Sequence, residues 1–169
     1  MATGSGTRED PWQLKTPPGT SDYTMYRDEA AEPPAIVCQV GSTQLRYHLR
    51  AIDDLHAMLK VHGDWMELGA ADEQKDAKPG TVEAWGRDPS NPVGGWYGLR
   101  KGYRGRFGMY LPPLLEALGL AELTHDAKNN RMRAICRDGR ALAVRTWACP
   151  SSGRGTGSRR ASPATGRRP

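Results

Sequence analysis

The residue types that could carry out chemistry are concentrated in one stretch, WYGLRKGYRGRFGMY at positions 96–110. Its fifteen positions hold four basic residues, four glycines and five aromatic residues. Arginine and lysine bind phosphates and exposed aromatic rings stack on bases, so this combination is typical of a nucleic-acid surface. The same aromatics could instead fill a core, because the chain has one Phe and must draw its large rings from Trp and Tyr.

The nucleic-acid interpretation assigns a role to each part of the stretch. Basic residues contact phosphates and aromatic residues stack on bases or sugars, at about 1–3 kcal/mol per stacked base. The phosphate contacts are Arg100, Lys101, Arg104 and Arg106, and the stacking residues are Trp96, Tyr97 and Tyr103. Glycines at 95, 98, 102, 105 and 108 would each cost a helix about 1 kcal/mol, so we expect a loop that becomes helical near Arg106.

Other chemistry has little support in the sequence. Cys38, Cys136 and Cys149 form no C-x-x-C pair and the four histidines form no H-E-x-x-H motif, so neither a disulfide framework nor a metal site is indicated. Asp53 and His56 could form a catalytic pair, but an aspartate in a first helical turn has a simpler role at the helix dipole. No nucleophile motif stands out. The sequence therefore does not favour an enzyme and implies no cofactor and no small-molecule substrate.

The charge is divided unevenly along the chain. Residues 1–99 carry nine Lys and Arg against fifteen Asp and Glu, whereas residues 100–135 carry seven against three. Residues 136–169 hold eight arginines and one aspartate, so this tail accounts for the pI of about 9.3. An acidic first half beside a basic second half predicts either an anionic partner or an internal electrostatic match.

The tail is also low in complexity. Gly, Ser, Arg and Pro dominate it, and such a composition buries too little apolar surface to offset its ordering entropy, so we expect residues 136–169 to be disordered. They could add nonspecific affinity for nucleic acid through counterion release. They could equally be an appended extension without function. We expect a disordered segment at residues 1–10 as well.

Hydrophobic periodicity predicts an α+β domain over residues 11–135. An N-terminal half, residues 11–69, holds an antiparallel hairpin or three-stranded sheet from YTMYR, AIVCQV and TQLRYHL, then a helix from Ile52 to His62 that stops at Gly63. A second half, residues 80–135, opens with a helix start capped by Thr81. A helix with an apolar stripe from Phe107 to Leu118 follows, either kinked or split by two prolines and firm from Pro112. A short hairpin closes the domain.

The order of helix and hairpin in LPPLLEALGLAELTHDAKNNRMRAI resembles the final helix and wing of a winged-helix DNA-binding domain. The resemblance places the helix that begins near Arg106 in the recognition position. It assigns the wing contacts to Lys128, Asn129, Asn130, Arg131 and Arg133. The pattern departs from the family because Asp88 to Gly105 separate the two helices, where three or four residues are usual.

The run from PWQLKTPPGTS through NPVGGWYGLRKGYRGRFGMYLPPLLE to NNRMR resembles an uncharacterised family of small proteins from high-GC bacteria. That resemblance brings no established activity. No apolar run is long enough to span a membrane, so we expect a cytoplasmic location. The expected partner is DNA or RNA, and the alternative is a protein-interaction module that binds no nucleic acid, its aromatics being core residues. Such a module could pair with itself through an exposed strand edge.

Overall fold

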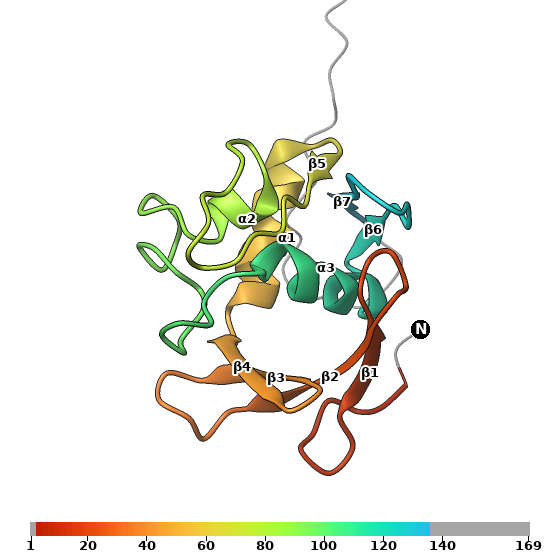
Figure 1. Cartoon of the computed structure of the whole chain (residues 1–169), viewed down its shortest axis with the longest axis vertical. Helices are drawn as coiled ribbons and strands as arrows, with labels where there is room; N and C mark the ends of the chain where they lie inside the picture. The colour runs from red at the N-terminus through yellow and green to blue at the C-terminus, as the bar shows by residue number, and fades with distance from the viewer. Residues whose placement is uncertain (1–2, 136–169) are drawn as a thin grey trace, which may run out of the picture.

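A four-stranded antiparallel sheet opens the fold. The computed structural model describes residues 3–135, and in it the strands follow one another in the order β1-β2-β3-β4 (Figure 1). They are β1 (Trp12–Lys15), β2 (Asp22–Asp28), β3 (Ala35–Val40) and β4 (Thr43–His48). The predicted hairpin is β3 and β4, joined at Gly41 and Ser42 with Val40 opposite Thr43. Strand β1 precedes the first proline loop, and the sequence did not predict it as a strand.

Alternation of side chains gives this sheet one buried face. Trp12 and Leu14 of β1, and Tyr23 and Met25 of β2, are buried, whereas Gln13 between them is exposed. A strand points successive side chains to opposite faces, so the period of two places these four against the helices. The buried face of this sheet therefore forms one side of the hydrophobic core.

The N-terminal segment lies along the edge of the sheet. Thr3 bridges to Gln13 of β1, and the Gly6 carbonyl accepts a hydrogen bond from the Arg27 amide of β2 at 2.9 Å. Arg27 also lies over the Trp12 ring at 4.9 Å. The contacts of Thr3 and Gly6 therefore give the segment expected to be disordered partners in the sheet that its sequence does not reveal.

Helix α1 (Ala51–His62) follows β4 directly. Asp53 and Asp54 lie in its first turn, and Gly63 ends it in the left-handed conformation at φ 71°, as the sequence predicts. Ala51, Ile52, Leu55 and Leu59 are its buried residues. The spacing of three and four places them on the face that packs against α3 (Phe107–Ala117) and β7 (Arg131–Ala134).

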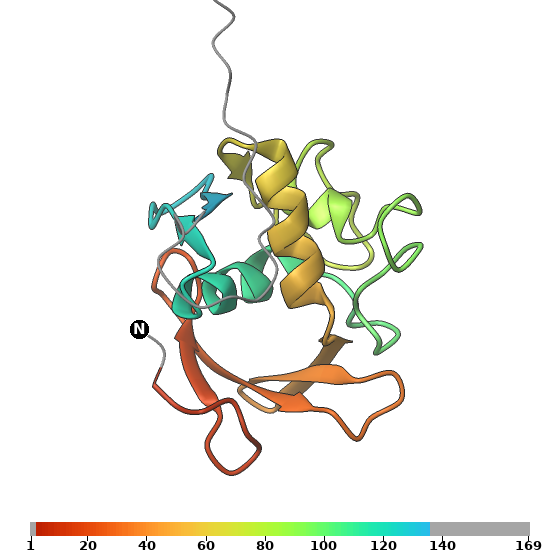
Figure 2. The ribbon, with the colours of Figure 1, turned by 180° about the vertical axis from the view of Figure 1, so that it is seen from behind.

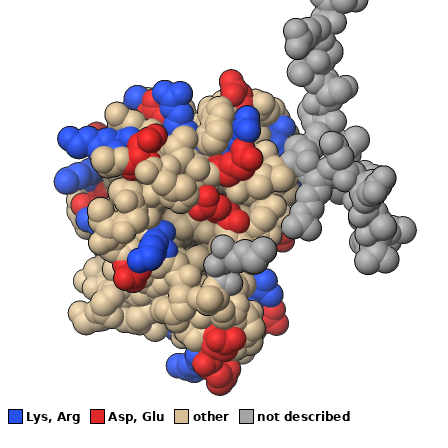
Figure 3. Space-filling model, turned by 90° about the vertical axis from the view of Figure 1, so that its right-hand side faces the viewer, with Lys and Arg blue, Asp and Glu red and all other residues tan. Residues whose placement is uncertain are grey.

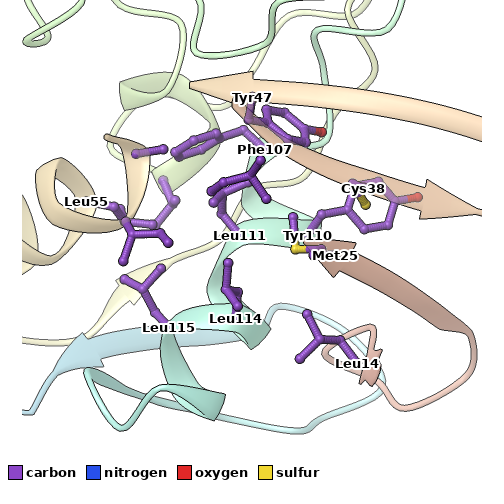
Figure 4. Packing of buried hydrophobic residues seen from close by; sticks show 14 of the residues in the cluster. Leu14, Met25, Cys38, Tyr47, Leu55, Phe107, Tyr110, Leu111, Leu114 and Leu115 are labelled. Carbon is purple, nitrogen blue, oxygen red and sulfur yellow. The ribbon is translucent and has the colours of Figure 1, made fainter. Parts of the chain in front are cut away.

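Helix α3 crosses the centre of the molecule, between the first sheet and the second (Figures 1 and 2). It is one continuous helix through Pro112 and Pro113, so of the two predicted forms, kinked or split, the split form is wrong. Eight of its eleven residues are buried, so contacts on all sides hold the helix where local propensity would interrupt it. Figure 4 shows Leu111, Leu114 and Leu115 of this helix among side chains from both halves of the chain.

A smaller sheet completes the fold, in the order β5-β7-β6. Its strands are β5 (Met66–Glu67), β6 (Ala121–Leu123) and β7, and the predicted C-terminal hairpin pairs Leu123 with Met132. The short helix α2 (Val82–Trp85) precedes α3 and begins at Thr81, whose hydroxyl accepts a hydrogen bond from the Ala84 amide at 3.2 Å. One core cluster includes buried side chains from both halves, so the two predicted halves share a core.

Among the residues that the structure describes, no helix has the length and apolar character needed to cross a membrane.

Candidate nucleic-acid interface

The basic stretch forms a loop, residues 96–106, that leads into α3; we call it the basic loop. Its first part pairs with the edge of the four-stranded sheet. The His48 amide donates to the Tyr97 carbonyl at 2.9 Å, and the Leu99 amide donates to the Arg46 carbonyl at 2.8 Å. Gly98 bridges to Tyr47 of β4. The loop therefore covers the edge of β4, which leaves that edge unavailable for pairing with a second chain.

Tyr97 belongs to the core. Its side chain is fully buried, its ring stacks on Trp85 at 5.1 Å, and its hydroxyl donates to the Asp54 carboxylate at 2.9 Å. Burial and the bond to Asp54 raise the pKa of Tyr97. The predicted stacking role leaves no free face on this ring, and the structure instead gives it the core role that the alternative interpretation assigned to the aromatic residues.

Two of the four basic residues are paired with an acidic loop, residues 70–78. Arg104 donates to Glu73 at 2.8 Å through Nε, and Arg106 donates to Asp72 at 2.5 Å through Nε. The hydrogen bonds from Arg104 and Arg106 lower the pKa of Glu73 and Asp72 respectively. The acidic and basic halves of the sequence thus meet here, as the predicted internal electrostatic match requires.

The ion pair between Glu83 and Arg87 is buried, and it lies where the acidic loop and the basic loop meet α2 and α3. Glu83 of α2 is 1% exposed, and its carboxylate bonds Arg87 and accepts the Gly108 amide at 2.7 Å. Burial raises the pKa of Glu83, and the bonds from Arg87 and Gly108 oppose that rise. Because Gly108 lies in the first turn of α3, the carboxylate also caps this helix.

Trp96 lies beside two guanidinium groups. Arg87 is 4.4 Å and Arg104 is 4.8 Å from the centroid of its ring system. Each arginine is itself held by a carboxylate, Glu83 or Glu73. The half-buried indole is therefore part of the scaffold that joins the two loops, with cation–π contacts on its ring.

The tip of the basic loop is exposed to solvent and forms no ion pair with the acidic loop. Arg100, Lys101 and Tyr103 are exposed, Tyr103 by 45%, and we refer to these three residues as the tip. The Arg100 guanidinium lies 4.3 Å from the centroid of the Tyr103 ring and donates to the Gln44 carbonyl at 2.5 Å. Within residues 3–135, neither Arg100 nor Lys101 forms an ion pair.

A pocket of about 380 Å³ adjoins the tip. It is enclosed by the end of the β3–β4 hairpin, the acidic loop, the basic loop and the first turns of α3. Its lining includes Thr43, Leu45, Gln74, Tyr103, Arg106 and Tyr110. Burial raises the pKa of Tyr110, whereas the nearby Arg106 side chain opposes that rise.

Arg106 has an unusual backbone at this pocket. Its φ of 59° and ψ of 23° are left-handed, a conformation that costs a residue with a Cβ roughly 1–2 kcal/mol. Its amide donates to the Ala71 carbonyl at 2.7 Å, which anchors the start of α3 to the acidic loop. Strained residues of this kind cluster at binding sites, and Arg106 lines the pocket.

The residues predicted to form a wing lie in and after the connection between β6 and β7, and their side chains have different contacts. Asn129 adopts a positive φ of 56°, as expected for this residue type. Asn130 is 8% exposed, and its amide oxygen accepts the Asp126 amide at 2.7 Å, so this side chain holds the turn together. Arg133 pairs with Glu122 at 2.6 Å. Lys128 and Arg131 are exposed without an ion pair in the described residues.

The wing and the basic loop are not brought together. Figures 1 and 2 place the β6–β7 turn on one side of the molecule and the loops between α2 and α3 on the other, with α3 between them. Figure 3 shows the side of the molecule that carries the β6–β7 hairpin, where basic and acidic side chains are scattered among each other. The twelve predicted contact residues therefore form no single surface.

Sequence reasoning missed the pocket residues. Thr43, Gln74 and Tyr110 are far apart in the chain and carry no motif, so only the packing of three segments brings them near Arg106. The acidic loop did carry a signal, because Asp72, Glu73 and Asp76 fall in one polar stretch that matches the charge of the basic loop. Across residues 3–135, the side chains of His, Cys, Asp and Glu form no group of three that could hold a metal ion.

The chain belongs to a family of unknown function (DUF6855), whose model matches residues 4–135. This match agrees with the resemblance to an uncharacterised family that the sequence suggested. No curated protein and no solved structure matches the chain.

Proposed function

We propose that this protein binds nucleic acid through the tip of the basic loop, with Arg100 and Lys101 on phosphates and Tyr103 as the stacking residue. The observation that carries the proposal is the exposed Arg100–Tyr103 pair beside Lys101. Once Arg104 and Arg106 are paired with the acidic loop, the positive charge that remains free in the basic loop lies at this tip. Basic groups interleaved with an exposed aromatic ring suit a sugar–phosphate backbone and its bases.

Single strands fit this surface better than a duplex. Duplex readers usually insert a helix into the major groove, and such a helix needs a free face. Eight of the eleven residues of α3 are buried, so the helix expected in the recognition position has little surface to offer. A short loop with one open ring matches the contacts that proteins make with single strands.

The test is a titration of the full chain with a single-stranded oligonucleotide at two or more salt concentrations. We expect Arg100→Ala/Lys101→Ala to weaken binding and to reduce the slope of log K against log salt by about 1 to 1.5, because each lost phosphate contact removes about 0.7. The matched control is Lys128→Ala/Arg131→Ala, which removes the same charge from the other side of the molecule. Both double variants keep residues 136–169 and their arginines unchanged.

Equal losses in the two double variants would overturn the proposal, since net charge alone would then explain binding. Salt-insensitive binding would contradict it as well.

A protein partner is the second candidate, and the same exposed pair favours it. Tyr and Arg are enriched at the energetically dominant positions of protein interfaces. Self-association by strand pairing has less support, because the basic loop covers the edge of β4 and Thr3 bridges to the edge of β1. Absence of nucleic-acid binding in the titration would shift the assignment of the tip to a protein partner.

A further inference from the structure

We infer that the pocket beside the tip takes one unstacked nucleobase of the bound strand. This inference rests on the proposed function and deepens it, because it makes the ligand a strand with accessible bases rather than a sugar–phosphate backbone alone. It is carried by the position of the pocket, by its size, and by the groups that line it.

Position is the first step. Tyr103 belongs both to the tip and to the lining of the pocket. Arg100 lies over its ring at 4.3 Å, so a base on the other face of the ring would extend an arginine–tyrosine stack. A strand whose phosphates contact Arg100 and Lys101 therefore has its neighbouring base at the mouth of the pocket. Stacking on aromatic and arginine planes is the usual way that unpaired bases are held.

Size is the second step. The pocket volume of about 380 Å³ is near the lower end of the roughly 300–1,000 Å³ that small-molecule sites span. A volume of this size has room for one planar ring system. Leu45, Val40 and the Tyr110 ring supply apolar surface for such a ring.

The third step is the polar lining. Asp72 binds Arg106 through Nε, and the Tyr110 hydroxyl lies beside the same guanidinium, so part of its set of five N–H donors is left for acceptors on a base. Thr43 adds a hydroxyl and Gln74 adds an amide, each of which both donates and accepts. Base edges present mixed donors and acceptors, so this set matches them better than it matches an anion alone, because Asp72 and Glu73 also line the pocket.

The experiment compares two strands of equal length on the full chain: an oligothymidylate and a fully abasic strand with the same phosphates. Stacking of one base is worth about 1–3 kcal/mol, so the wild type is expected to prefer the strand with bases by about fivefold to 150-fold. Thr43→Trp fills the pocket and should abolish this preference while leaving the salt slope unchanged. Gln13→Trp, an exposed substitution on β1 that does not line the pocket, is the control.

Tyr103→Ala provides a second variant, because an exposed loop side chain can be removed without disturbing the core. It should lower the preference for bases while Gln13→Trp retains it. Equal affinity of the wild type for the two strands would overturn the base pocket yet leave the phosphate contacts of the proposed function standing. So would a preference that Thr43→Trp retains, because stacking on Tyr103 without the pocket would then explain it.

A ligand without phosphate tests the base pocket independently of the proposed phosphate contacts. Thymidine titrated into the wild type should shift the NMR signals of Thr43, Tyr103 and Tyr110, and Thr43→Trp should remove these shifts. If neither strand binds but thymidine does, the proposed function fails and the base pocket is retained. If thymidine causes no shifts at the pocket, the inference fails whatever the strands do.

Discussion

At the residue scale, Glu83 holds more of the local structure together than the exposed charges do. Its carboxylate is buried, bonds Arg87, and accepts the amide of Gly108. Arg87 in turn donates to the carbonyls of Ala71 and Lys75 in the acidic loop. A buried ion pair contributes little net stability, but removal of one partner leaves an uncompensated charge.

Glu83→Gln should therefore destabilise the fold strongly. The amide keeps the shape of the side chain but leaves Arg87 without its counter-charge, so we expect a loss of about 3–5 kcal/mol in the free energy of unfolding. Urea denaturation measures it. Glu122→Gln is the matched control, because Glu122 pairs with Arg133 on the surface, where such pairs contribute at most about 1 kcal/mol. Losses of similar size in the two variants would contradict this role for Glu83.

At the scale of the elements, the backbone of the basic loop packs directly against the backbone of the acidic loop at Gly105. A Cβ added at Gly105 would lie 2.4 Å from the Glu73 nitrogen and 2.6 Å from the Asp72 carbonyl carbon. Gly105 also accepts a hydrogen bond from the buried Tyr47 hydroxyl at 2.8 Å. The glycine is therefore required by the close approach, and the ion pairs of Arg104 and Arg106 depend on that approach.

Gly105→Ala is expected to push the acidic loop away from the basic loop. The protein should lose more than about 2 kcal/mol of unfolding free energy, and the preference for strands with bases should fall, because the walls of the pocket separate. Gly19→Ala is the control. Gly19 has a φ of 74° with nothing within 4 Å, so its substitution costs only the left-handed conformation, roughly 1–2 kcal/mol. A Gly105→Ala protein that is as stable as Gly19→Ala would show that the loops can separate without cost.

Elements with a strong local signal were predictable from the sequence, and elements that depend on distant contacts were not. The spacing from Ile52 to His62 and the stop at Gly63 indicated α1 correctly. The same reasoning expected a helix that is kinked or split at Pro112 and Pro113, and it could not foresee that burial between the two sheets keeps α3 in one piece. The candidate site divides in the same way: the exposed tip carries its own signal in residue type, whereas the sequence left a stacking role and a core role open for Tyr97, and tertiary packing decides for the core.

At the scale of the whole molecule, charge separates the chain into two parts. Residues 1–135 carry sixteen Lys and Arg against eighteen Asp and Glu, and residues 136–169 carry eight arginines against one aspartate. The family model ends at residue 135, and the predicted disorder of the tail concerns residues outside those that the structure describes. Electrostatic affinity for nucleic acid can therefore be divided by experiment between the exposed cations of residues 1–135, to which the proposed tip belongs, and the arginines of residues 136–169.

Removal of residues 136–169 should separate these sources. We expect the shortened protein to keep its unfolding free energy within about 0.5 kcal/mol, because the family model ends at residue 135 and the core cluster found among the described residues remains intact. Its affinity for single strands and its salt slope should both fall, since up to eight arginines no longer release counterions. The remaining binding should still depend on Arg100 and Lys101. If the shortened protein binds no strand at all, the tail is the nucleic-acid-binding part, and the tip of the basic loop must serve a different partner.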